Sequence, residues 1–269
     1  MTLRWLATMG FFALCLDPAV AQANRERPGA VAEVDVIEAI DTPLDKTMSL
    51  TDHRGETVTL GDFFDGTRPV ILTMNYYRCG TLCDLMLHEL AKTLARSQWP
   101  PGGQYRVVTV GIDPRETAKD AARRRNLVLS PKQRDEFDWS FVVAAAPAIE
   151  RLADTVGFRL RYHQDSDQWA HPAAIVIASP DGRIKAYRYG VRFPARTLRF
   201  SLLDAAEGSV GSVADRVVLS CFRYDDLTGR YVPYAWGVMR IGASLFALLL
   251  FAGLAVLWRR EARPPKGGG

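Results

Sequence analysis

Cysteine and histidine are scarce in this chain, with 4 residues of each among 269. Thiol and soft-metal chemistry must therefore rest on a handful of side chains. The sequence has no internal repeat and no low-complexity stretch beyond its Pro/Gly tail, which favours a single core over residues 24–208. The formal net charge is only +4, and much of it falls in the C-terminal tail and in residues 123–125. This weak basic excess gives no reason to expect a nucleic-acid partner.

Two of the cysteines form the most informative motif in the chain. Cys79 and Cys83 follow a hydrophobic run at residues 69–77 and lie at the start of a helix-forming segment at 82–96. Positions i and i+4 share one face of a helix, with Cα atoms roughly 6 Å apart. That spacing suits a disulfide, and it equally suits two thiolates on one soft metal ion. Since a helix start also favours the thiolate, the motif predicts thiol redox chemistry, soft-metal binding, or both.

The two ends of the chain predict where this chemistry takes place. Residues 1–23 have the pattern of a secretory signal peptide, with an apolar core that contains Cys15 and an Ala-Gln-Ala cleavage site. Residues 241–258 run without a charge, which predicts a single transmembrane helix at 236–258. The positive-inside rule places the basic tail at 259–269 in the cytoplasm. We therefore expect a single-pass protein of the inner (cytoplasmic) membrane whose main domain faces the periplasm.

Strand and helix patterns alternate through residues 24–208. This alternation predicts an α/β domain, and a CxxxC motif after the first long strand favours a thioredoxin-like fold. A hairpin is expected at 48–64, helices at 82–96, 117–129, 147–156 and 194–206, and further strands at 105–112, 139–145, 173–178 and 183–189.

Four features stand together over roughly residues 44–206. They are Cys79-x-x-x-Cys83, Gly111-Ile-Asp-Pro114 after the next strand, His171 ahead of an apolar strand, and the turn Ser179-Pro-Asp-Gly182. With these features the sequence resembles the Sco/SenC family, whose members are thioredoxin-fold proteins that bind copper and help to assemble the CuA centre of cytochrome c oxidase.

The resemblance implies that Cys79, Cys83 and His171 bind a copper ion. Two thiolates and one imidazole make a soft ligand set that suits Cu(I), and also Cu(II) where the geometry allows it. Structural zinc usually needs a fourth ligand, which the sequence does not obviously supply. The implied function is that of a copper metallochaperone rather than an enzyme. Its partners would be the copper subunit of a respiratory oxidase and an upstream copper donor or thiol reductant.

A second class of function stays open at this point. In a periplasmic thiol–disulfide oxidoreductase Cys79 would attack a substrate and Cys83 would resolve the mixed disulfide. Replacing His171 by alanine would destroy metal binding in the first case and leave disulfide exchange largely intact in the second. A peroxidase is not expected, because the Pro and Thr residues that precede a peroxidatic cysteine are missing.

Several residues depart from the family pattern or stand outside it. Asp84 replaces the usual proline after the second cysteine and is expected to repel the thiolates and attract a cation. Pro172 stands where thioredoxin-like enzymes carry a cis-proline, and the sequence leaves the cis or trans state of its peptide bond open. Cys221 lies in the juxtamembrane segment 209–235, as a resolving thiol, a further copper ligand, an intermolecular bridge or an inert thiol.

The remaining candidates are expected to be structural. Asp113 should shape the loop beside the site, and Met86 should be a core residue. Helix 117–129 should carry its arginines on a polar face. The remaining histidines, His53, His88 and His163, are expected at the surface.

Overall fold

The computed structural model describes residues 36–79, 82–97, 99, 101–207, 222–225, 230–233, 239, 242–243, 246–247, 249–255 and 258; the side chains of 82–83, 222–225 and 230–233 lie outside the description. The chain divides into two units, Met1–Glu33 and Val34–Gly269, and all described residues belong to the second. The predicted signal peptide with Cys15, the residue Cys221 and the basic tail lie outside the described residues, as does much of the predicted span 236–258.

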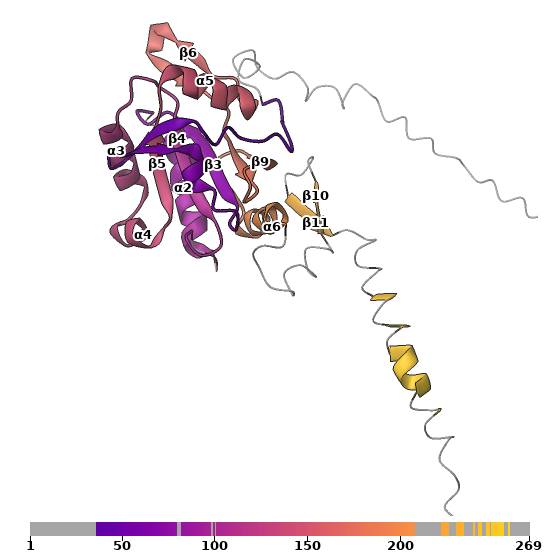
Figure 1. Ribbon diagram of the computed structural model, residues 1–269. Coiled ribbons are helices and arrows are strands. Elements are labelled where there is room, and N and C mark those ends of the chain that lie inside the picture. The colour runs from indigo at the N-terminus through magenta and orange to yellow at the C-terminus, as the bar shows by residue number, and fades with distance from the viewer. Residues whose placement is uncertain are drawn as a thin grey trace, which may run out of the picture. The chain divides into compact units, whose positions relative to one another are not determined.

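A seven-stranded sheet in the order β2-β1-β5-β4-β3-β8-β9 forms the centre of the domain (Figure 1). Strands β3, β4 and β5 run parallel, whereas β8 is antiparallel to β3 and β9 is antiparallel to β8. The strands are β1 (Ser49–Asp52), β2 (Thr57–Thr59), β3 (Val70–Asn75), β4 (Arg106–Gly111), β5 (Trp139–Val143), β8 (Ala174–Ala178) and β9 (Ile184–Tyr189).

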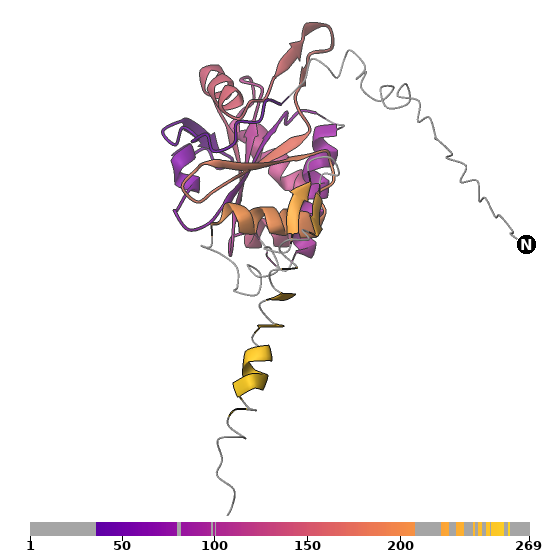
Figure 2. The ribbon, with the colours of Figure 1, turned by 90° about the vertical axis from the view of Figure 1, so that its right-hand side faces the viewer.

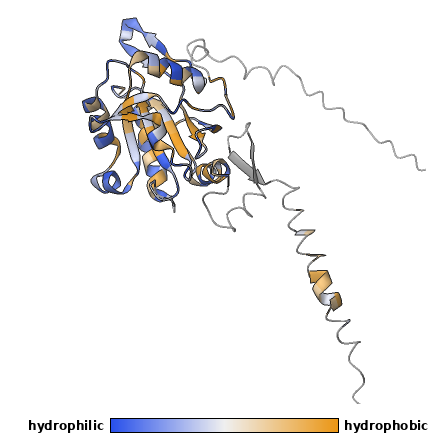
Figure 3. Ribbon diagram, in the orientation of Figure 1, coloured by the Kyte–Doolittle hydropathy of each residue, from blue (hydrophilic) through white to orange (hydrophobic). Residues whose placement is uncertain are grey.

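The central strands are buried on both faces, as expected for strands covered by helices on either side. All six residues of β3 are buried, and Ile71 faces one core cluster while Leu72 and Met74 face the other. Figure 3 shows that the central strands are largely hydrophobic. Helices α2, α3 and α6 pack on the Ile71 side and α5 on the opposite side (Figure 2). The helices are α2 (Leu82–Arg96), α3 (Ala118–Val128), α5 (Ala146–Thr155) and α6 (Ala195–Ala205).

These elements confirm the predicted α/β alternation and the thioredoxin-like fold. The predicted hairpin at 48–64 is β1 and β2, which pair antiparallel with Leu50 opposite Val58, followed by the short 3-10 helix η1 (Leu60–Phe63). Within the part of the chain that the structure describes, no helix combines the length and apolar character that crossing a membrane requires.

Some elements were not predicted. The segment around Tyr162 has the polar composition that predicts a loop, yet it forms a small hairpin in which Tyr162 pairs with Trp169. Its strands are short and carry few apolar residues, so no hydrophobic alternation marks them. The unpredicted elements are α4 (Pro131–Glu136), β6 (Arg161–His163), η2 (Gln164–Ser166) and β7 (Gln168–Ala170). Strands β10 (Phe222–Asp225) and β11 (Arg230–Pro233) form a separate antiparallel pair, as the turn sequence Asp-Asp-Leu-Thr-Gly between two aromatic segments predicts.

Candidate functional site

Cys79 lies in the turn that follows β3. Cys79 is buried, at 8% exposure, and its backbone N–H donates to the carbonyl of Tyr76 at 3.2 Å. The preceding Tyr77 is anchored in the core, since its hydroxyl bonds to the carbonyl oxygens of Thr109 at 2.7 Å and Val142 at 2.8 Å. The end of β3 is therefore held firmly just before the first cysteine.

Cys83 belongs to the first turn of α2, as the sequence predicts. Its side chain lies outside the described residues, as do Gly80 and Thr81. The backbone arrangement nevertheless matches the expected one, with a strand, a turn that carries Cys79, and a helix that begins beside Cys83.

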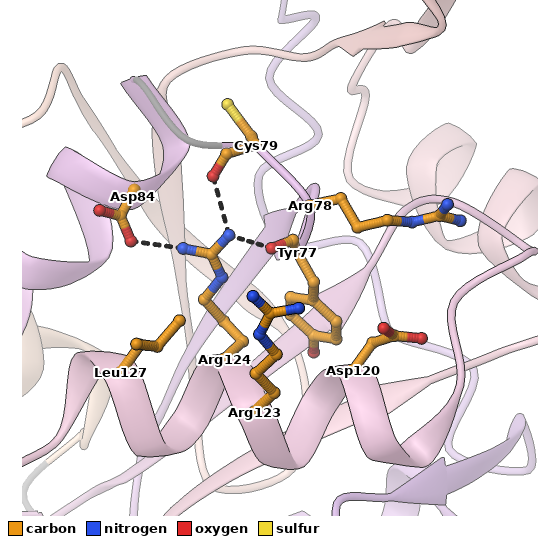
Figure 4. Close-up of a pocket in the computed structure, with 8 residues that line it drawn as sticks. All are labelled: Tyr77, Arg78, Cys79, Asp84, Asp120, Arg123, Arg124 and Leu127. Atoms are coloured by element: carbon orange, nitrogen blue, oxygen red, sulfur yellow. Dashed lines mark hydrogen bonds and ion pairs between the residues drawn. The ribbon is translucent and has the colours of Figure 1, made fainter.

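Arg124 of α3 binds both sides of the cysteine loop (Figure 4). Its Nη2 donates to the carbonyl oxygen of Cys79 at 2.8 Å and to that of Tyr77, while Nη1 forms an ion pair with Oδ1 of Asp84 in α2. The side chain of Arg124 is only 7% exposed. The expectation that the arginines of this helix occupy a polar face is therefore wrong for Arg124, and the reason is that Asp84 and two backbone carbonyls supply its partners.

A signal in the sequence could have indicated this burial. Arg124 falls at the helical spacing of the buried residues Ala121 and Val128, i+3 and i+7 on one face. The pattern was obscured because Arg124 stands within a run of three arginines.

Asp84 has a different role from the one expected of it. Besides the ion pair with Arg124, its carboxylate lies 3.3 Å from Nδ1 of His88. Its charge is thus compensated by Arg124, so the expected repulsion of the thiolates is largely cancelled. His88 also contacts two backbone carbonyls. Its Nδ1 is 2.9 Å from the carbonyl oxygen of Asp84, and its Nε2 is 3.2 Å from that of Leu127.

A cavity of about 290 Å³ lies beside Arg124 (Figure 4). It is lined by Tyr77, Arg78, Cys79, Asp84, Asp120, Arg123, Arg124 and Leu127.

Asp113 anchors the loop after β4, as expected of the Asp-Pro element. Its side chain is completely buried, and Arg115 holds it through Nε at 2.9 Å and Nη2 at 2.8 Å, while Nη2 of Arg78 lies at 3.1 Å. Burial tends to raise the pKa of Asp113, but the hydrogen bonds and charges of Arg115 and Arg78 outweigh it, so the pKa lies below its ordinary value. Arg78 directly precedes Cys79, so its contact with Asp113 links this loop to the cysteine turn.

Glu116 lies beneath the same turn and was not singled out from the sequence. The backbone N–H of Arg78 donates to its Oε1 at 3.1 Å, and among the described residues its buried Oε2 has no hydrogen-bond partner. Burial raises the pKa of Glu116 to about 8, against opposing hydrogen bonds from the Tyr77 and Arg78 backbone. Glu116 therefore supports the base of the cysteine turn, and its raised pKa favours the protonated form of the carboxyl group at neutral pH.

His171 precedes β8, which runs antiparallel to β3, so it lies at the end of the sheet where Cys79 follows β3. Strand β8 pairs antiparallel with β3, with Ile175 opposite Thr73, so the start of β8 lies beside the end of β3.

The imidazole of His171 contacts the backbone of the next residue. Its Nδ1 lies 3.0 Å from the carbonyl of Pro172. Because a carbonyl only accepts, Nδ1 carries the proton and Nε2 keeps the lone pair that a metal would need. Burial lowers the pKa of His171, which favours the neutral ring. The peptide bond that precedes Pro172, whose state the sequence leaves open, is trans, since no cis peptide bond occurs among the described residues.

The other candidate residues differ in how deeply they are buried. Met86 is a core residue at 1% exposure, and His163 is exposed, both as expected. His53 is half-buried rather than a surface residue, and burial lowers its pKa. The described side chains form no group of three or more His, Cys, Asp or Glu residues arranged to hold a metal. The side chain of Cys83, which the predicted set requires, lies outside the described residues.

The chain belongs to the SCO1/SenC family, because the model of that family matches residues 39–198, more than half of the chain. Its fold is similar to that of a putative electron transfer protein from Aquifex aeolicus VF5, at 26% identity and a TM-score of 0.55, over 62% of this chain and 94% of that one. A putative electron transport protein from the same organism matches at 25% identity and a TM-score of 0.52, over 62% and 98%.

A copper-bound ScoI structure from Arabidopsis thaliana aligns at 19% identity and a TM-score of 0.47, over 63% of this chain and 99% of that one. No curated protein matches the chain.

Proposed function

We propose that this protein binds one copper ion through Cys79, Cys83 and His171 and delivers it to the copper subunit of a respiratory oxidase. The observation that carries the proposal is the pairing of β3 with β8, which brings the segments bearing Cys79 and His171 to one end of the sheet. Family membership supports it, since the family match spans all three residues. Two thiolates and a neutral imidazole are the donors that Cu(I) prefers.

Copper is the cargo in this proposal, and the protein's part is to present ligands and release them. The cysteine pair must be reduced to bind, since a disulfide offers no thiolate. The Nδ1–H of His171 is held by the carbonyl of Pro172, and this leaves Nε2 as the donor atom. Release would then proceed by ligand exchange with thiolates and imidazoles of the recipient.

The test is the stoichiometry and affinity of copper binding by the reduced full-length protein. We expect one copper per chain in the wild type and a loss of affinity of at least about a hundredfold in His171→Ala, because one of three ligands is removed. His163→Ala is the matched control, since His163 is exposed on the β6 hairpin, and it should bind as the wild type does.

Undiminished copper affinity in His171→Ala would contradict the proposed ligand set. If the reduced wild type holds no copper but exchanges readily with a glutathione buffer, the protein is the thiol–disulfide oxidoreductase instead.

We propose also that residues 236–258 anchor the protein in the inner membrane with its domain in the periplasm, and that residues 1–23 direct its export. The uncharged run 241–258 with basic residues after it supports this topology. The full-length protein should stay in the membrane pellet after alkaline carbonate extraction, whereas a chain ending at residue 235 should appear in the soluble periplasmic fraction. Extraction of the full-length protein by carbonate alone would rule out the span.

A further inference from the structure

Arg124 contacts the cysteine loop at both of its ends (Figure 4). On one side it binds the carbonyl oxygens of Tyr77 and Cys79, and on the other the carboxylate of Asp84, the residue next to Cys83. A single guanidinium from α3 thus connects the turn after β3 with the first turn of α2.

The chemistry of arginine suits this connection. The guanidinium is planar and rigid and offers several donors in fixed directions, which a lysine ammonium does not. Burying this charge is costly unless hydrogen bonds and a counter-ion compensate it. Two carbonyls and a carboxylate compensate Nη1 and Nη2 of Arg124 here, while its buried Nε has no hydrogen-bond partner among the described residues. Arg124 and these three acceptors therefore stabilise one another.

We infer that Arg124, together with Asp84, is the positioning residue of the cysteine pair: it sets the separation of Cys79 and Cys83 by fixing the backbone next to each of them. This inference deepens the proposed function, because it concerns the same two residues. A disulfide forms readily only when the two Cα atoms lie about 4.4–6.8 Å apart, and a loop held near that spacing gives the two thiols a high effective concentration. Loosening the loop lowers that concentration and disfavours the disulfide.

The measured reaction is the exchange of the protein disulfide with glutathione. Two molecules of reduced glutathione supply two electrons and two protons, the Cys79–Cys83 bond is broken, and one molecule of oxidised glutathione forms. The ratio of reduced to oxidised protein is measured by trapping the thiols with an alkylating reagent and then cleaving the chain at basic residues. Cleavage after Arg78 and Lys92 releases peptide 79–92, which holds both cysteines and excludes Cys15 and Cys221.

In Arg124→Gln the equilibrium constant for forming the disulfide should fall about tenfold, a rise in reduction potential of about 30 mV. Arg124→Lys keeps the charge but cannot reach all three acceptors, so it should recover less than half of this shift on a logarithmic scale. Asp84→Ala should lower the constant in the wild-type background and add little in the Arg124→Gln background, because the two residues act as one unit.

Arg123→Gln is the matched control, since Arg123 is exposed, precedes Arg124 on the same helix and lines the same cavity. It should change the constant by less than twofold. Thermal unfolding of each variant identifies loss of fold, and Asp84→Ala keeps the test available if Arg124→Gln does not fold.

An unchanged constant in a folded Arg124→Gln or Asp84→Ala protein would overturn the inference. So would an equal shift in Arg123→Gln or full recovery by lysine, either of which would indicate a general effect of charge. The assay contains no copper, so a failure of the copper proposal leaves this result to stand by itself.

Discussion

Replacing Gly157 by alanine should destabilise the domain by about 3 kcal/mol or more, because two separate costs combine at this position. Gly157 has φ +67, a conformation that alanine adopts only with strain. An added Cβ would also lie 1.8 Å from the carbonyl oxygen of Ile37 and 2.8 Å from its carbonyl carbon, and both are backbone atoms that cannot rotate away.

The collision would displace a segment that secures the domain. Ile37 donates from its N–H to the carbonyl of Gly157 at 2.9 Å, and the neighbouring Val36 pairs with Phe158. Each backbone hydrogen bond lost would add about 1 kcal/mol to the cost.

Gly190→Ala separates the collision from the strain. Gly190 has φ +91 with nothing within 4 Å of an added Cβ, so only the conformational cost of about 1–2 kcal/mol applies. Free energies of unfolding from urea titration should therefore rank wild type, Gly190→Ala and Gly157→Ala in that order. Equal losses in the two variants would show that the contact with Ile37 yields without cost.

The sequence predicted those parts of the fold whose signals are local. Strand β3 is rich in strand-forming residues and α2 in helix-forming ones, so both were found with nearly correct ends. Helix α4 is only six residues long and begins with a capping box at Ser130 and Gln133, a signal too short for hydrophobic periodicity to reveal.

The site was predicted only as far as its chemistry can be read from residue types. Cys79, Cys83 and His171 are recognisable as donors, whereas the partners of Arg124 come from a strand end and a helix that are distant in sequence. A charged residue between two other arginines suggests a solvated face, and only tertiary structure supplies the acceptors that allow its burial. The role of Asp84 was misjudged for the same reason.

Glu116 was missed on similar grounds, and it carries the other large expected effect. It is 5% exposed, its Oε1 accepts from the N–H of Arg78, and burial raises its pKa from an ordinary 4.5 to about 8, with the nearby Asp113 adding to the rise. At pH values between these two pKa values, the folded protein holds a proton on Glu116 that the unfolded chain has released. The folded state then binds more protons, so its stability falls as pH rises, by up to about 1.4 kcal/mol per pH unit.

Glu116→Gln should abolish this dependence. The amide has the shape of the protonated acid, cannot ionise, and can still accept from the N–H of Arg78 through Oε1. The free energy of unfolding, measured by urea titration from pH 5 to pH 8, should therefore fall by about 2–4 kcal/mol more in the wild type than in Glu116→Gln.

Taking the difference between the two proteins removes the contributions of every other titrating group, including the cysteines and His171. Glu150→Gln, at an exposed position on α5, controls for the loss of one carboxylate and should keep the wild-type slope. Parallel stability curves for the wild type and Glu116→Gln would mean that Glu116 ionises as freely in the folded protein as in the unfolded chain. Diverging curves would instead establish that the support beneath Arg78, next to Cys79, changes its charge near neutral pH.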